Sequence, residues 1–126
     1  MAGRSFVQLL GAADPGVVLL GISFLPQGTG SISSSQISGR GVASVAWSTD
    51  RYVVTLQDQY ASLLSATATL QLATAADQFC QIGAINLTNK TIEIVVWDVS
   101  TPGAVSVAAN AGNKINLTLV LKNSGV

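Results

Sequence analysis

The segment ATATLQLA, residues 66–73, alternates apolar and polar side chains, and this alternation constrains the fold more than any other feature. Successive side chains of a β-strand point to opposite faces of the sheet, so a period of two predicts a half-buried strand. The segment KINLTLVLK, residues 114–122, has the same period. We therefore expect two strands whose inward residues are Ala66, Ala68, Leu70 and Leu72 in the first and Ile115, Leu117, Leu119 and Leu121 in the second.

Two hairpins are expected between and before these strands. FCQIGAINL and TIEIVVWDV are joined by TNK, a polar connection whose length is typical of an antiparallel hairpin. WSTDRYVVTLQDQY, residues 47–60, predicts two strands around an STD turn, and its alternation places Tyr52, Val54 and Leu56 inward. Residues 58–66, DQYASLLSA, allow one helical turn before the next strand begins.

The remaining β-prone segments are SFVQLL, VVLLGISFL, GVASVAWS and RYVVTLQ, and turn-forming residues separate them. The sequence therefore contains about eight short predicted strands. This pattern predicts a single domain over residues 1–126, an all-β, jelly-roll-like antiparallel sandwich. Residues 27–39, rich in Gly and Ser, are expected to form a long loop or an arm within it.

The scarcity of charge is the informative feature of the composition. Charged residues make up 10% of the 126 residues, against about 25% in typical domains, and the formal net charge is zero. Such a chain lacks the usual protection against self-association, so we expect a homo-oligomer, a trimer rather than a dimer. The six Lys and Arg residues form no basic stripe, which argues against a nucleic-acid partner.

Membrane insertion and secretion are not expected either. The longest apolar run, GVVLLGISFL, has about half the length that spans a bilayer. Near the N-terminus, Gln8, Asp14 and Pro15 interrupt the apolar run before a signal-peptide core is complete. The single cysteine, Cys80, cannot form an internal disulfide, which suits assembly in a reducing cytoplasm.

No catalytic residue, metal site or cofactor is predicted. The chain has no His, which closes the common Ser-His-Asp and Cys-His mechanisms. Nothing in the spacing of the carboxylates fixes a pair suited to glycoside hydrolysis, and the turn residues around Asp50, Asp58 and Asp77 favour local hydrogen bonding. The carboxylates considered are Asp50, Asp58, Asp77, Glu93 and Asp98.

Two sets of apolar residues exceed what one small core needs to bury. In TIEIVVWDV the face opposite Ile92, Ile94 and Val96 is also apolar, which indicates a second covered face and therefore a subunit interface. Residues 1–13 are a possible extended N-terminal arm that contacts another protein or a neighbouring copy. The predicted interface residues are Val95, Trp97 and Val99 in the strand and Phe6, Val7, Leu9 and Leu10 in the arm.

From Phe24 onward, the segments that carry a family pattern are FLPQGTG, GVASVAW, YVVTLQDQYASLLSATATLQLA, IGAINLTNKTIEIVVWD and NKINLTLVLKNS. In these segments the chain resembles a family of small virion proteins encoded by tailed bacteriophages. The resemblance implies a capsid decoration or cement protein, made in the cytoplasm of the host bacterium, that binds the major capsid protein on the outer surface of the head. The pattern is also similar to trimeric jelly-roll heads of the complement and tumour-necrosis-factor type.

A tail-fibre or receptor-binding module is the alternative function. It would use the same β architecture and present loops to carbohydrate. Such a module needs aromatic side chains on its surface, for which Trp47, Tyr52 and Tyr60 are the candidates.

Overall fold

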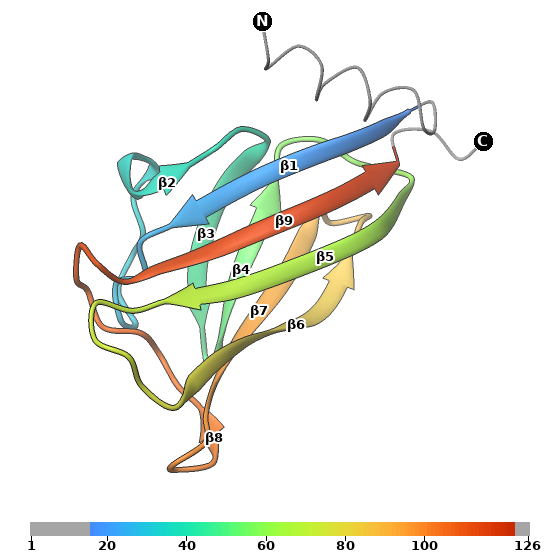
Figure 1. Ribbon diagram of the computed structural model, residues 1–126. Coiled ribbons are helices and arrows are strands. Elements are labelled where there is room, and N and C mark those ends of the chain that lie inside the picture. Colours follow the sequence, from blue (N-terminus) through green and yellow to red (C-terminus); the bar gives the residue numbers. More distant parts are fainter. Residues whose placement is uncertain (1–15, 123–126) are drawn as a thin grey trace, which may run out of the picture.

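Two antiparallel β-sheets face each other in a sandwich, seen in the computed structural model, which describes residues 16–122 (Figure 1). One sheet has the strand order β2-β1-β9-β5, and the other has the order β3-β4-β7-β6 with β8 paired to β7. The strands are β1 (Val17–Phe24), β2 (Ile37–Ser38), β3 (Val42–Ser48), β4 (Arg51–Leu56), β5 (Ser62–Gln71), β6 (Gln78–Asn86), β7 (Thr91–Asp98), β8 (Gly103–Ala104) and β9 (Lys114–Lys122). The predicted all-β antiparallel sandwich is confirmed.

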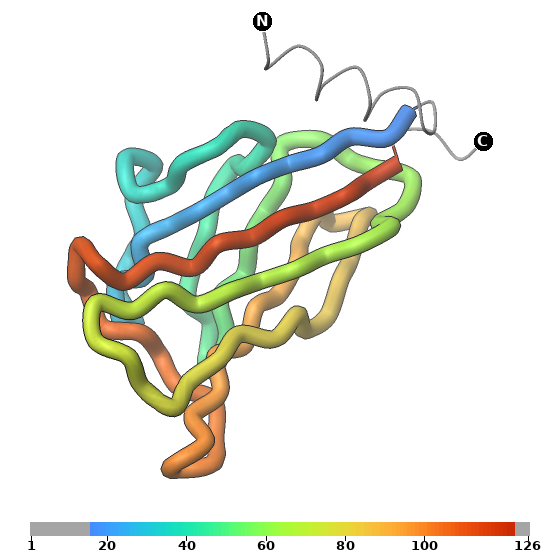
Figure 2. Tube along the Cα trace, viewed as in Figure 1, coloured from blue at the N-terminus to red at the C-terminus, as the bar shows by residue number. Residues whose placement is uncertain are grey.

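The chain path alternates hairpins with crossings between the sheets (Figure 2). β3–β4 and β6–β7 are hairpins within one sheet, and β8 pairs with β7 in that sheet, whereas the connections after β2, β4, β5 and β8 lead to the opposite sheet. β1 and β9, far apart in sequence, pair along all of β1, from Val17 opposite Lys122 to Phe24 opposite Ile115. This pairing places the first and the last strand of the described chain side by side in the same sheet.

The core confirms the predicted alternation. In β9 the residues Ile115, Leu117, Leu119 and Leu121 are at most 1% exposed. In β5, Ala66, Ala68 and Leu70 also face inward but are only half-buried, because β5 is an edge strand. The other sheet contributes Tyr52, Val54, Leu56, Ile92, Ile94 and Val96, each at most 1% exposed.

Both predicted hairpins are confirmed by their turns. Ser48 pairs with Arg51 around a two-residue turn in which Thr49 has a φ of 58°. The second hairpin closes between Asn86 and Thr91, and Lys90 there has a φ of 65°. Positive φ at a turn position suits the twist of the two strands that it connects.

The helical turn that residues 58–66 allowed is not formed. Tyr60 is instead 7% exposed in the core, and β5 begins at Ser62 opposite Lys122 of β9. Pairing with β9 over the length of β5 therefore overrides the weak local preference for a helix.

Residues 27–39 are a loop that returns to its own sheet. It contains one 3-10 turn, Ser34–Gln36, and then β2, where Ser38 pairs with Ser23. Gly39 has a φ of 101° and lies directly against the backbone of Gly21, where a Cβ atom would collide. Glycine is required there because both the close approach and the positive φ exclude a side chain.

Candidate interaction surface

The outward side of β7 carries two of the three interface residues predicted here, and the third follows the strand. Val95 is half-buried and Trp97 is 36% exposed, while Val96 between them faces the core. Val99 follows the strand and is 61% exposed. Its N–H donates to the carbonyl oxygen of Asp77 at 2.8 Å, so the turn that begins at Val99 stays hydrogen-bonded to the residue before β6. The three side chains therefore belong to β7 and to the turn directly after it.

Phe79 belongs to the same surface, although the sequence pattern does not single it out. It lies opposite Trp97 in the β6–β7 pairing and is 49% exposed. The Trp97 Nε1–H donates to Gln81 Oε1 at 2.7 Å, which fixes the orientation of the indole ring. We call Phe79, Val95, Trp97 and Val99 the β6–β7 patch. The turn alone does not give this pairing, because a bulge between Ile82 and Ile85 shifts the register by one residue, and without that shift Cys80 would lie opposite Trp97.

A small ion-pair cluster lies on two strands of the same sheet. Arg51 Nε donates to Asp50 Oδ1 at 2.7 Å, and Arg51 Nη1 donates to Glu93 Oε1 at 2.8 Å. The hydrogen bond from Arg51 lowers the pKa of Asp50, and both carboxylates raise the pKa of Arg51. A general acid needs a raised carboxyl pKa, so the shift at Asp50 is in the wrong direction for that role. The geometry is that of a partly exposed ion pair, which contributes little to stability.

The other carboxylates organise turns or lie on the surface. Asp98 Oδ1 accepts hydrogen bonds from the N–H groups of Ser100 and Thr101, at 2.9 and 3.2 Å, and Asp98 Oδ2 accepts one from Gln78 Nε2 at 3.3 Å. The hydrogen bond from Thr101, followed by those from Gln78 and Ser100, lowers the pKa of Asp98. Asp77 accepts the Ser100 hydroxyl at 2.9 Å. Within residues 16–122, no group of three or more His, Cys, Asp or Glu side chains is placed to hold a metal ion.

Two of the three aromatic residues considered for sugar binding are in the core. Tyr52 is 0% exposed and Tyr60 is 7% exposed. Trp47 packs edge-on against Tyr52, with ring centroids 5.0 Å apart, and is half-buried. Its remaining surface lines a pocket of about 260 Å³ together with residues 29–32. Only Trp47 therefore remains available to a ligand.

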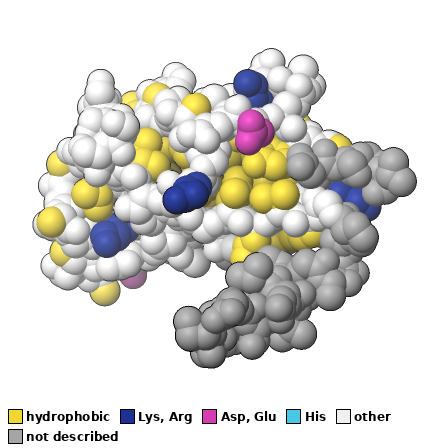
Figure 3. Space-filling view, turned by 90° about the horizontal axis from the view of Figure 1, so that it is seen from above, with side chains coloured by type: hydrophobic (Ala, Val, Ile, Leu, Met, Phe, Trp, Pro, Cys, Tyr) yellow, Lys and Arg dark blue, Asp and Glu magenta, His cyan; other side chains and the backbone are white. Residues whose placement is uncertain are grey.

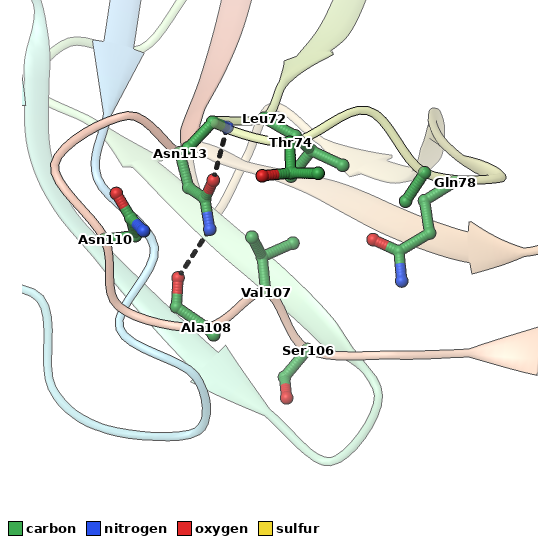
Figure 4. Close-up of a pocket in the computed structure, with 10 residues that line it drawn as sticks. Leu72, Thr74, Gln78, Ser106, Val107, Ala108, Asn110 and Asn113 are labelled. Atoms are coloured by element: carbon green, nitrogen blue, oxygen red, sulfur yellow. Dashed lines mark hydrogen bonds between the residues drawn. The ribbon is translucent and has the colours of Figure 1, made fainter.

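A larger pocket of about 330 Å³ lies between the loops at residues 72–78 and 106–113 (Figure 4). Asn113 joins these loops: its Oδ1 accepts from Ala73 N–H at 2.9 Å, and its Nδ2 donates to the Ala108 carbonyl at 3.1 Å. Asn110 Oδ1 accepts from Gly112 N–H at 2.8 Å. The pocket has no charged or aromatic lining residue, and these amides already serve the loops.

Cys80 faces the core opposite Val96, and burial raises its pKa from the ordinary 9.0 to about 11. The pKa of the Cys80 thiol is higher in the folded than in the unfolded protein. The neutral thiol therefore contributes its full share to the free energy of unfolding below pH 9, and this contribution is lost as the pH rises toward 11. We predict that the free energy of unfolding falls over this interval and that it falls less steeply in Cys80→Ala. Denaturant titrations at pH 8 and pH 10.5 measure this difference. Equal pH dependence in both proteins would contradict the assignment.

The arm residues Phe6, Val7, Leu9 and Leu10 lie outside the described residues.

The described residues form an antiparallel β-sandwich with an apolar patch on the outer surface of one sheet, and this fold and surface define the structural class of the protein. Comparisons with protein-family models, with curated proteins and with solved structures found no match to this chain. Among residues 16–122, no helix has the length and apolar character to cross a membrane.

Proposed function

We propose that this protein is a head decoration or cement protein of a tailed bacteriophage, which binds the major capsid protein on the outer surface of the shell and stabilises it. The observation that carries the proposal is the β6–β7 patch, in which two large aromatic side chains lie side by side on the outside of a sheet. Large exposed apolar groups on a small domain mark protein contacts. The resemblance to small phage virion proteins supplies the partner.

The distribution of charge agrees with a permanent contact. Figure 3 shows only a few Lys, Arg, Asp and Glu side chains among polar and hydrophobic atoms on one face of the molecule. Interface centres are poor in charged residues and rich in aromatic ones, because burying an unpaired charge is costly. A neutral chain also fits a position on the outside of the shell, away from packaged DNA.

Cementing is a mechanical function. Each bound copy adds buried interface across a junction between capsid subunits, so the shell resists internal pressure better. The capsid repeats the same binding site many times, and a protein that contacts several subunits at once gains affinity from multivalency. A homo-oligomer, which we propose to be a trimer rather than a dimer, would provide such multiple contacts.

The arm supplies a second proposed contact. We predict that deleting residues 2–10 leaves the sandwich folded, because β1 pairs with β9 from Val17 onward without them. The truncated protein is expected to oligomerise but to lose binding to shells stripped of the protein, because the arm would add a strand to a capsid sheet. Circular dichroism and co-sedimentation with stripped shells measure the two effects. Unfolding of the truncated protein, or normal rebinding, would refute the arm contact.

The function is tested by locating the protein in purified phage particles. Cryo-electron microscopy of particles with and without the gene is expected to show density for the sandwich at repeated positions on the head. Density on the tail alone would instead favour the receptor-binding alternative, which the Trp47 pocket supports. A Trp47→Ala variant would then lower adsorption to host cells without changing the head.

A further inference from the structure

The charged residues of the strands are all on central strands, and this placement leaves the sheet edges uncharged. Arg51 is in β4, Glu93 and Asp98 are in β7, and Lys114 and Lys122 are in β9, each of which has a neighbour on both sides. The edge strands carry no charged residue and no proline. Proteins that stay monomeric usually protect their edges with such residues, with bulges or with covering segments. An uncharged edge without those devices can accept another strand.

Three of the four edges have some other protection. A bulge interrupts β6 between Ile82 and Ile85, and another interrupts β3 between Val42 and Ser44. Part of β1 is paired with β2, and the loop that holds Gly39 and Gly41 lies against its middle. β5 differs from these strands. Its bulge lies near its start, between Leu63 and Ser65, and leaves residues 65–71 regular and unpaired on the outer side.

The side of the sandwich at β5 is also incompletely closed. β5 and β6 are in contact and run along the same side of the molecule (Figure 2). Their inward residues Ala66, Ala68 and Leu70 in β5 and Cys80 and Ile82 in β6 are half-buried, whereas the inward residues of β9 are at most 1% exposed. A strand added beside β5 would cover apolar surface as well as form backbone hydrogen bonds.

We propose that the β5 edge pairs with β5 of a second copy of this chain, antiparallel and about a twofold axis at Ala68. In this register Thr67 lies opposite Thr69 of the second copy and Ser65 lies opposite Gln71, so polar residues meet polar residues on the outer face. On the inner face Ala66 lies opposite Leu70 of the second copy. The two four-stranded sheets become one continuous sheet of eight strands, within the range of known open sheets.

The sequence of this segment suits a second copy. A twofold contact places each residue near its own equivalent, so a charge close to the axis would face the same charge. Residues 65–71, SATATLQ, contain none. Cross-strand Thr pairs are favourable in antiparallel sheets, and the zero net charge adds no repulsion between copies. The inference rests on the proposed homo-oligomer and names a strand that joins copies in pairs. Because a cyclic trimer has no twofold axis within it, this contact would join two of the proposed trimers into a hexamer.

Charge placement on Thr67 and Thr69 tests both the contact and its register. Thr67→Lys with Thr69→Lys sets like charges opposite each other twice, whereas Thr67→Lys with Thr69→Glu sets Lys opposite Glu. We expect sedimentation equilibrium to give a wild-type species of at least twice the 12.9 kDa chain. The Lys/Lys protein is expected to weaken this contact about tenfold or more, a change of about 1.4 kcal/mol, and the Lys/Glu protein to retain it.

The matched control places two lysines on the edge strand β3, at the exposed residues Ser44 and Ser48, and is expected to leave the mass unchanged. Circular dichroism checks that every variant is folded, which is expected because all substituted positions are exposed. A monomeric wild-type protein overturns the proposal, as does equal weakening by the Lys/Lys and Lys/Glu pairs. A trimer that the Lys/Lys pair does not change also overturns it, while leaving the proposed head decoration function intact.

Discussion

Replacing Tyr52 with Phe is expected to lower the free energy of unfolding by about 2–3 kcal/mol, although it removes a single oxygen atom. The Tyr52 hydroxyl donates to the Gly28 carbonyl at 3.1 Å and accepts the Val107 N–H at 2.9 Å. These partners belong to two different loops, residues 25–36 and 105–113, so one buried phenol joins both loops to the core. Without the hydroxyl, the Val107 N–H stays buried and unpaired, and leaving a buried donor unpaired accounts for most of the expected loss.

Tyr60→Phe is the matched control for this experiment. Within residues 16–122 the Tyr60 hydroxyl makes no hydrogen bond to another residue, and its ring is also buried. Removing the Tyr60 hydroxyl is expected to change the free energy of unfolding by about 0.5 kcal/mol or less. Urea titrations of the three proteins measure both values. A Tyr52→Phe protein as stable as the control would show that the hydroxyl does not hold the two loops.

The strands of this protein could be predicted because their alternation is local. In β9 every second residue from Ile115 to Leu121 is buried, as the sequence pattern requires. The two hairpins were also predictable, since a short polar turn between two β-prone segments determines that they pair. The stretch from Trp47 to Tyr60, although rich in polar and aromatic residues, follows the same rule: Tyr52, Val54 and Leu56 face the core.

Contacts that depend on how the sheets are connected could not be predicted. Arg51 and Glu93 are 42 residues apart and meet because β4 and β7 are neighbours, which no local pattern specifies. The bonds from Tyr52 to Gly28 and Val107 depend on crossings between the two sheets. The pairing of Phe79 with Trp97 also could not be predicted, although both belong to one hairpin, because it depends on the bulge between Ile82 and Ile85.

The ion-pair cluster and the β6–β7 patch are neighbours on the outer surface of one sheet. Glu93 and Val95 are alternate residues of β7 and point to the same side, so the cluster ends where the patch begins. Charged groups at the border of an apolar contact remain partly hydrated and contribute orientation more than affinity. The affinity of this surface should therefore depend on its aromatic residues.

Trp97→Ala is expected to weaken binding to shells stripped of the protein by about 30-fold or more, which corresponds to at least 2 kcal/mol. A tryptophan in the centre of a contact buries a large apolar area, and its loss also leaves Phe79 without its neighbour across the strands. The fold should be preserved, because Trp97 is on the surface and the core residues of β7, Ile92, Ile94 and Val96, are unchanged.

Two further variants show whether the loss comes from the ring, from its hydrogen bond or from apolar area in general. Trp97→Phe removes the bond to Gln81 but keeps an aromatic ring, so it should weaken binding by less than Trp97→Ala. Leu19→Ala removes a 48% exposed apolar side chain from β1, on the opposite sheet, and should leave binding unchanged. Co-sedimentation of each protein with stripped shells gives the affinities, and thermal unfolding reports on the fold. If Trp97→Ala binds as the wild type does, or if Leu19→Ala weakens binding equally, the β6–β7 patch is not the surface that contacts the shell.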